Sequence, residues 1–253
     1  MKNKKLNYLI LIIFVLFRGT QFSSGQNTMT LNFGKSKIHF DSIFVKTDSL
    51  IFINLHNNEQ TSIKAIKQVL PAAYGEFLGL QSGGKRELTV SENGKFITFD
   101  PNRIFTKTGI ELTLKKYKSF STENIKLVDA FAKEILAKLS KAKLIIALHN
   151  NTDGGYSIQS ISKTNEKNKD ATDIFINFKM DEDDFYIVTE KSEFDFLKSK
   201  SYNVVLQDSQ NVADDGSLSV YCGRHQMNYI NIECQNGHLA QQIKMIQQIF
   251  TFK

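Results

Sequence analysis

Cysteine is scarce in this 253-residue chain, which contains only Cys222 and Cys234. Their spacing matches no thiolate metal-binding motif, so a zinc site held by cysteines is excluded. If the protein is exported, the two thiols either form a disulfide or remain as small buried apolar groups. The sequence leaves both interpretations open.

Segments that would divide the chain into several domains are also missing. The sequence has only 2 prolines and 14 glycines, with no proline- or glycine-rich linker and no internal repeat. Residues 26–253 are therefore predicted to form one domain, which is long enough to bury a sizeable core.

Apolar runs of membrane-spanning length are absent as well. The apolar run at residues 6–17 is shorter than the roughly 20 residues of a spanning helix. Lysines precede it at positions 2, 4 and 5, and small residues typical of a cleavage site follow at 23–25. This pattern predicts a signal peptide over residues 1–25 and a secreted or periplasmic protein without a stable membrane anchor after cleavage. An uncleaved N-terminal anchor is the alternative.

The excess of basic residues lies largely in this leader. The formal net charge is +6, and residues 1–25 contain four basic residues and no acidic one, so the remaining chain carries +2. Without the leader, the chain does not have the excess of basic residues that is typical of nucleic-acid-binding proteins, and we expect no nucleic-acid partner.

Helical and strand-like patterns alternate along residues 26–253. Helices are expected at residues 61–70, 123–139, 193–199 and 239–250, where apolar side chains recur at helical spacing. Strands are expected at residues 37–45, 50–55, 76–81, 86–90, 95–99, 144–148, 174–178, 185–189, 204–207, 217–222 and 228–233. The polar residues 160–172 are expected in a surface loop. A helix followed by a buried strand occurs twice, which predicts an α/β fold.

An apolar strand that ends in a histidine also occurs twice. His56 ends the first, with Glu59 three positions later, and His149 ends the second. Because ligand sites gather at the carboxyl ends of strands in α/β sheets, we expect these side chains to meet. Two imidazoles and a carboxylate are the ligand set of an open catalytic zinc site. The competing hypothesis for each histidine is a hydrogen-bonded polar residue at a strand end.

Glu233 ends a later strand in which side chains alternate. Ile230 and Ile232 point to one face, and Asn231 and Glu233 point to the other. A carboxylate in this place can take a proton from water and pass it to a leaving amine. The alternative is a surface glutamate on an edge strand, which the apolar neighbours argue against.

Arginine is the scarce basic residue, since only Arg86, Arg103 and Arg224 follow the leader. Arg103 follows Asn102 in the stretch DPNRIF. Its planar guanidinium can hold a carboxylate with two parallel hydrogen bonds, and Asn102 can add an amide donor. A structural salt bridge is an equally good interpretation of Arg103 taken alone.

Together these motifs resemble the zinc carboxypeptidase superfamily, and most closely the branch of succinylglutamate desuccinylase and aspartoacylase. The order is His-x-x-Glu, Asp-x-Asn-Arg-x-Phe, a strand-end histidine and a strand-end glutamate, over residues 50–233. The resemblance implies an α/β fold with a mixed, mostly parallel sheet sandwiched between helices. It also implies zinc as cofactor, held by His56, Glu59 and His149, with Glu233 as general base and acid and with Asn102 and Arg103 binding a substrate carboxylate.

The sequence departs from the family pattern in three places. The arginine that stabilises the oxyanion has no clear match, and Arg86 and Lys95 compete for that role. The tyrosine that closes over substrate has only Tyr202 and Tyr221 as candidates. The chain ends soon after Glu233, so the C-terminal domain of aspartoacylase is missing, and we expect a more open cleft and a larger substrate.

The sequence therefore predicts an exported zinc-dependent hydrolase that cleaves an amide bond. The favoured form is a carboxypeptidase-like metallopeptidase for peptides with a free carboxylate, such as cell-wall peptides. One alternative is a deacylase for small N-acyl amino acids, and another is a non-catalytic peptide- or sugar-binding protein. The presence of Glu233 favours an enzyme, because binding alone does not need a general base.

Overall fold

The computed structural model describes residues 25–46 and 49–252. The predicted leader thus lies outside the described residues except for Gly25, and its assignment stays a prediction. None of the described helices has both the length and the apolar character to cross a membrane.

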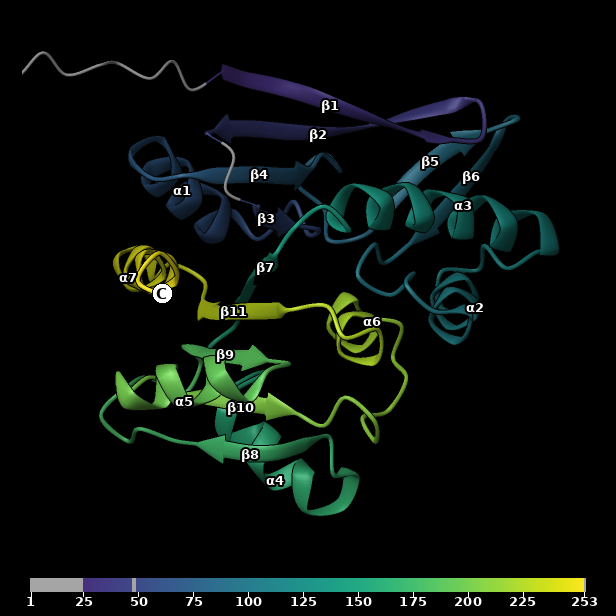
Figure 1. Cartoon of the computed structure of the whole chain (residues 1–253). Helices are drawn as coiled ribbons and strands as arrows, with labels where there is room; N and C mark the ends of the chain where they lie inside the picture. The colour runs from purple at the N-terminus through teal and green to yellow at the C-terminus, as the bar shows by residue number, and fades with distance from the viewer. Residues whose placement is uncertain (1–24, 47–48, 253) are drawn as a thin grey trace, which may run out of the picture.

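A nine-stranded mixed sheet forms the centre of the molecule (Figure 1). The strands of the chain are β1 (Gly25–Phe33), β2 (Ser36–Val45), β3 (Leu50–Asn54), β4 (Gly75–Leu80), β5 (Leu88–Glu92), β6 (Lys95–Phe99), β7 (Leu144–Asn151), β8 (Ala171–Phe175), β9 (Phe185–Val188), β10 (Val204–Gln207) and β11 (Tyr229–Gln235). The helices are α1 (Gln60–Val69), α2 (Lys107–Lys116), α3 (Thr122–Leu139), α4 (Ile158–Asn168), α5 (Lys191–Ser199), α6 (Leu218–Arg224) and α7 (Leu239–Ile249), with a 3₁₀ turn η1 at Leu70–Ala72.

The strand order in the large sheet is β1-β2-β4-β3-β7-β11-β9-β10-β8, and β5 and β6 form a separate hairpin. Its central strands β4, β3, β7 and β11 run parallel, so their carboxyl ends share one edge. Strands β1 and β2 extend the sheet antiparallel on one side. On the other side β9 is antiparallel to β11, β10 is parallel to β9, and β8 is antiparallel to β10. This topology confirms the predicted α/β fold.

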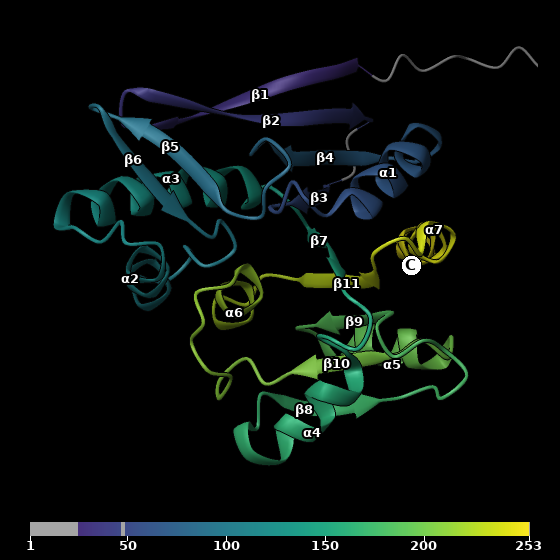
Figure 2. The same ribbon diagram turned by 180° about the vertical axis from the view of Figure 1, so that it is seen from behind.

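Helices cover both faces of the sheet (Figures 1 and 2). One face packs against α1, α5 and α7 through a core that includes Phe52, Tyr186 and Ile230. The other face packs against α2, α3, α6 and the β5–β6 hairpin through Phe33, Phe99 and Phe131. Because side chains in a strand alternate between faces, each central strand supplies apolar residues to both cores.

Two sequence predictions about local structure are wrong. Residues 217–222 form no strand, because they begin helix α6, whose N-cap Ser217 accepts a hydrogen bond from Val220 N–H at 3.4 Å. In this short helix the buried residues are Leu218, Val220 and Cys222, so the sequence alternates as a strand would. Residues 160–172 contain most of helix α4, whose polar composition arises because only Ile158 is buried. Strand β1 and helix α2 were not predicted.

Candidate metal centre and active site

The carboxyl ends of three parallel strands bring the predicted site residues together. His56 lies just beyond β3, and Glu59 is the N-cap residue of α1. A tight turn, in which Glu59 N–H donates to His56 O at 3.0 Å, keeps the two side chains close. His149 lies in β7 in register with Glu233 of β11. The sheet therefore places four residues from distant parts of the chain at one edge.

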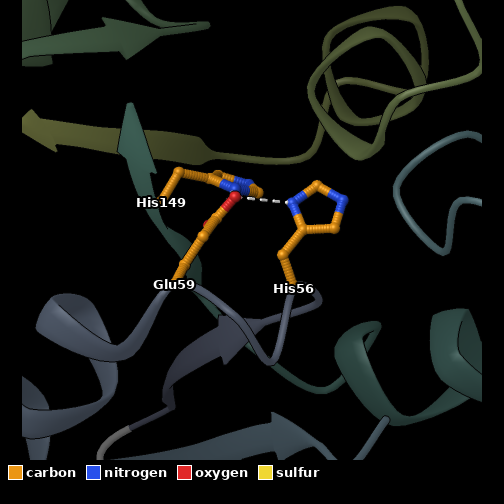
Figure 3. Close-up of side chains that lie close together, drawn as sticks. All are labelled: His56, Glu59 and His149. Atoms are coloured by element: carbon orange, nitrogen blue, oxygen red, sulfur yellow. Dashed lines mark hydrogen bonds and ion pairs between the residues drawn. The ribbon is translucent and has the colours of Figure 1, made fainter. Parts of the chain in front are cut away.

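Glu59 lies between the two histidines (Figure 3). Its Oε1 is 2.9 Å from His56 Nδ1, and its Oε2 is 2.9 Å from His149 Nδ1. One ligand atom from each residue lies within 4.8 Å of the others, and all three residues are buried. Glu59 Oε2 also accepts the Asn150 N–H at 3.2 Å. The predicted ligand set thus converges on one point.

The electrostatic balance of this group favours an ionised carboxylate. Burial alone would raise the pKa of Glu59, but the charges and hydrogen bonds of His149 and His56 outweigh it and lower the pKa to about 2. Burial alone would lower the pKa of His56, but its hydrogen bonds to Asp100 and Glu59 hold that pKa above its usual value. A cation at this point would have an ionised carboxylate beside it.

Asp100 orients His56, a role that the sequence did not reveal. Its Oδ1 is 2.8 Å from His56 Nε2, and it lies directly after β6. Burial alone would raise the pKa of Asp100, but His56 and Arg86 lower it. Asp100 is the first residue of the DPNRIF stretch, so its position in the motif was the signal that could have identified it.

The donor set fits a zinc ion. Both Nδ1 atoms face the same carboxylate, and two imidazole nitrogens with one carboxylate suit the borderline character of zinc. The remaining nitrogen of His56 contacts a carboxylate, which is the arrangement that fixes the tautomer of metal-binding histidines. His56, Glu59 and His149 are therefore the residues that would hold the metal.

Glu233 lies beside this group on β11 and is buried, with 7% of its surface exposed. Its Oε1 accepts a hydrogen bond from Asn231 Nδ2 at 3.0 Å. Burial raises the pKa of Glu233, and the nearby His149 opposes part of this rise. A carboxylate with a raised pKa is a better proton acceptor than an exposed one.

A cavity of about 500 Å³ opens in front of these residues. Arg86 lines it, and its Nη1 donates to Glu59 Oε1 at 3.0 Å while its Nε lies 3.4 Å from Asp100 Oδ2. Lys95 does not join the site, which corrects its candidacy for the oxyanion role. It is exposed at the far end of β6 from Asp100, about 16 Å away at about 3.3 Å per residue.

Asn102 and Arg103 line the same cavity. Asn102 Oδ1 accepts the Leu218 N–H at 3.0 Å, and its Nδ2 lies 3.5 Å from His149 Nε2. Arg103 Nη1 donates to the carbonyl of Asn102 at 2.8 Å and lies 3.5 Å from Asp215 Oδ2. About a third of the Arg103 side chain is exposed, so its guanidinium remains accessible from the cavity.

A close contact between two glycines holds the loop that carries Arg103. Gly216 has φ +78°, and a Cβ there would meet the Cα of Gly109 at 2.4 Å and the Arg103 carbonyl oxygen at 2.7 Å. The Gly216 carbonyl accepts the Phe105 N–H at 3.0 Å. Only glycine fits this position, because a side chain would push α2 away from the loop.

Tyr156, rather than either predicted tyrosine, lines the cavity. It lies in the loop after β7, and its ring packs edge-on against Phe185 at 5.6 Å. Tyr202 packs against Tyr186 in the core on the opposite face. Tyr221 stacks on His225 at 3.9 Å. No motif distinguishes Tyr156 in the sequence.

The two cysteines do not pair. Both are free and buried, and they belong to the cores on opposite faces of the sheet. Burial raises the pKa of Cys222 to about 12. Of the two interpretations of the cysteines, the structure therefore supports buried apolar groups.

Comparison with known proteins supports the fold. No family model matches the sequence, and a search of curated proteins finds no match. Thrombin activatable fibrinolysis inhibitor is similar in structure with a TM-score of 0.51 and 10% identity, over 90% of this chain and 68% of that one. An aspartoacylase family protein from Mesorhizobium loti has a TM-score of 0.45 and 13% identity, over 90% and 67% of the two chains. The murein-tripeptide amidase MpaA from Escherichia coli O157 has a TM-score of 0.44 and 10% identity, over 83% and 86%.

These identities are low, so the similarity concerns the fold alone. At that level the chain shares its overall fold with thrombin activatable fibrinolysis inhibitor. The mixed α/β fold that the sequence predicts is therefore also found in a solved structure.

Proposed function

We propose that this protein is a zinc-dependent hydrolase that cleaves amide bonds, and that it acts as a metallocarboxypeptidase on peptides with a free carboxylate. The observation that carries the proposal is the convergence of His56, Glu59 and His149 beside the buried carboxylate of Glu233. The metal ligands alone would suit a structural site. A buried carboxylate next to them, at the wall of a cavity of about 500 Å³, is the arrangement of a hydrolytic site.

The proposed reaction divides the work among the chain's own groups. The chemistry that zinc supplies when bound is Lewis acidity towards a carbonyl and a water, whose pKa falls to about 7. Glu233 takes a proton from the attacking water and gives it to the amine nitrogen as the C–N bond breaks. Arg86, which lines the cavity beside Glu59, donates to the carbonyl oxygen as negative charge develops there.

Arg103 is the proposed anchor for the substrate carboxylate. It is the partly exposed guanidinium on the wall of the cavity, and its planar donors match a carboxylate. A substrate bound there would place its last amide bond towards the metal, which favours removal of C-terminal residues. The nearby Asp215 is the ion-pair partner that such a carboxylate would partly displace.

The basic, apolar and small-residue pattern of residues 1–25 supports export to the periplasm or the medium. Peptides of the cell envelope are then a natural substrate class for the proposed activity. Expression of the full chain followed by N-terminal sequencing of the extracellular or periplasmic protein tests this. A mature N-terminus near residue 26 would support export, and an intact leader on cytoplasmic protein would refute it.

The activity is tested with zinc-loaded protein and paired N-acyl dipeptides that end in a free carboxylate or a C-terminal amide. We expect hydrolysis of the free acids, with the amides slower by about 10-fold or more because Arg103 loses its partner. Hydrolysis of N-acyl amino acids alone would instead identify a deacylase. If zinc binds but neither class is hydrolysed, the proposal of an enzyme is wrong and a binding protein is favoured.

A further inference from the structure

A glutamine is buried in the core between helix α7 and the sheet. Gln242 of α7 has none of its surface exposed, although α7 packs beside α1 over an apolar face of the sheet (Figure 1). A buried amide without hydrogen bonds destabilises a fold. The partners of this amide therefore indicate what the side chain does.

Both ends of the Gln242 amide contact strand β7 at a proposed metal ligand. Nε2 donates to the His149 carbonyl at 3.1 Å, and Oε1 accepts a hydrogen bond from Asn150 Nδ2 at 2.8 Å. Because His149 and Asn150 are successive residues, the two hydrogen bonds fix the direction of β7 at the point where it presents the His149 imidazole.

Asn150 connects this contact to the helix that carries Glu59. Glu59 is the N-cap residue of α1, but its carboxylate faces the histidines and makes no capping hydrogen bond in the described structure. The N–H groups in the first turn of the helix then need another acceptor. Asn150 Oδ1 accepts the Ser62 N–H at 2.9 Å, and the Asn150 N–H donates to Glu59 Oε2 at 3.2 Å. Asn150 thus caps α1 and leaves the Glu59 carboxylate available to a metal.

The Asn150 amide also reaches strand β11. Its Nδ2 donates to the Cys234 carbonyl at 3.1 Å as well as to Gln242, and Cys234 directly follows Glu233. The amide has one orientation only, because turning it over would point its N–H groups at the Ser62 N–H and its oxygen at two other oxygens. The segments of the site are therefore joined through one oriented side chain.

We propose that Gln242 is a positioning residue for the proposed metal centre, and that it acts through Asn150 to fix the spacing of His149 and Glu59. Without the hydrogen bonds from Gln242, the Asn150 amide loses its orientation, and α1 loses its cap. The Glu59 carboxylate is then free to turn from the histidines towards the N–H groups of α1. The three ligands remain, but their spacing no longer suits a zinc ion. The inference rests on the proposed metal centre and not on the proposed reaction.

The first test measures zinc affinity by competition with a chelator. Gln242→Met keeps the volume of the side chain and removes both hydrogen bonds. Gln247→Met, at an exposed glutamine of the same helix, is the matched control. We expect about 10-fold weaker binding in Gln242→Met, as is typical when an outer partner of a metal ligand is lost, and no change in the control. Equal affinity in wild type and Gln242→Met would overturn the proposal.

The rise in Tm that zinc causes separates lost positioning from lost stability. A variant that is only less stable has a lower Tm both with and without zinc, so the rise is retained. Ile249→Val, at a buried position in the apolar core beneath α7, provides such a variant. We expect a smaller rise in Gln242→Met and a retained rise in Ile249→Val. A retained rise in both would show that Gln242 only stabilises the fold.

Two further measurements test the route through Asn150. Gln242→Met is expected to weaken zinc binding less in an Asn150→Ala background than in wild type, because the connection is already lost there; full additivity would refute the route. In metal-free protein, hydrogen exchange at the Asn150 and Ser62 amides is expected to be faster in Gln242→Met, since both N–H groups are bonded in this network. Unchanged exchange at both amides would overturn the proposal without any measurement on zinc.

The outcomes distinguish this proposal from the proposed function. If Gln242→Met weakens zinc binding but wild-type protein hydrolyses no peptide, the positioning role stands and the proposed enzyme falls. If wild-type protein hydrolyses peptides with zinc and Gln242→Met binds zinc as tightly, the proposed enzyme stands and the positioning role falls.

Discussion

Replacing Glu233 with glutamine separates the proton transfer proposed for this side chain from its place in the fold. Glutamine has nearly the same shape, and its amide oxygen can still accept the hydrogen bond that Asn231 donates at 3.0 Å. The proposed metal ligands His56, Glu59 and His149 are unchanged. The substitution therefore removes the ability to accept a proton and little else.

Two consequences of the substitution are expected. Loss of a positioned general base lowers the rate by about 10²–10⁴-fold. Burial raises the pKa of Glu233, so ionisation of this side chain destabilises the metal-free fold as the pH rises. This destabilisation is absent below the pKa that Glu233 has in the unfolded chain, and it is complete above the pKa that Glu233 has in the folded protein. We therefore expect Glu233→Gln without metal to be at least as stable as wild type at pH 7, with a smaller difference at pH 4.

The assay combines three measurements on the variant, with Glu166→Gln as a control at an exposed glutamate. They are peptide hydrolysis with zinc, zinc content, and Tm in the presence of a chelator. We expect activity to be lost while zinc content and Tm are retained. A variant that keeps more than a tenth of the wild-type rate would refute the role of Glu233, and one that loses zinc would show that this side chain helps to hold the metal.

Three further predictions concern the surroundings of Glu233. Asp100→Asn weakens zinc binding about 10–100-fold by releasing His56, as measured by competition with a chelator; unchanged affinity would refute this role. Arg103→Lys raises KM about 10-fold for free-acid peptides with little change in kcat, because lysine keeps the charge but not the two parallel hydrogen bonds; a loss confined to kcat would contradict it. The rise in Tm on adding zinc is larger at pH 7.5 than at pH 5.5, because at low pH the raised pKa of His56 keeps on it a proton that competes with the metal; the opposite order would show that zinc binds elsewhere.

The convergence of His56, Glu59 and His149 could be predicted because the signals of these residues are local in the sequence. Apolar runs ending in His56 and His149 mark the carboxyl ends of two strands, and parallel strands bring such ends to one edge. The register that sets His149 beside Glu233 follows from the same rule. Order along the chain and position on each strand were sufficient for these residues.

Residues whose roles depend on packing could not be predicted in this way. Arg86 precedes strand β5 and Lys95 begins strand β6, so both lie near the β5–β6 hairpin in the sequence. Only the folded structure shows that Arg86 reaches Glu59. Tyr156 reaches the cavity through a loop that carries no motif. Helix α6 was mistaken for a strand because Leu218, Val220 and Cys222 alternate, and over so few residues a buried helix and a strand have the same pattern.

The central claim is that His56, Glu59 and His149 hold one zinc ion. The most direct test is the metal content of untagged protein after dialysis against buffered zinc, measured by mass spectrometry and compared with a folded His149→Ala variant. We predict one zinc per wild-type chain and a loss of at least 100-fold in affinity in the variant. Wild-type protein without zinc, or a variant that binds zinc as tightly, would contradict the assignment of the metal centre.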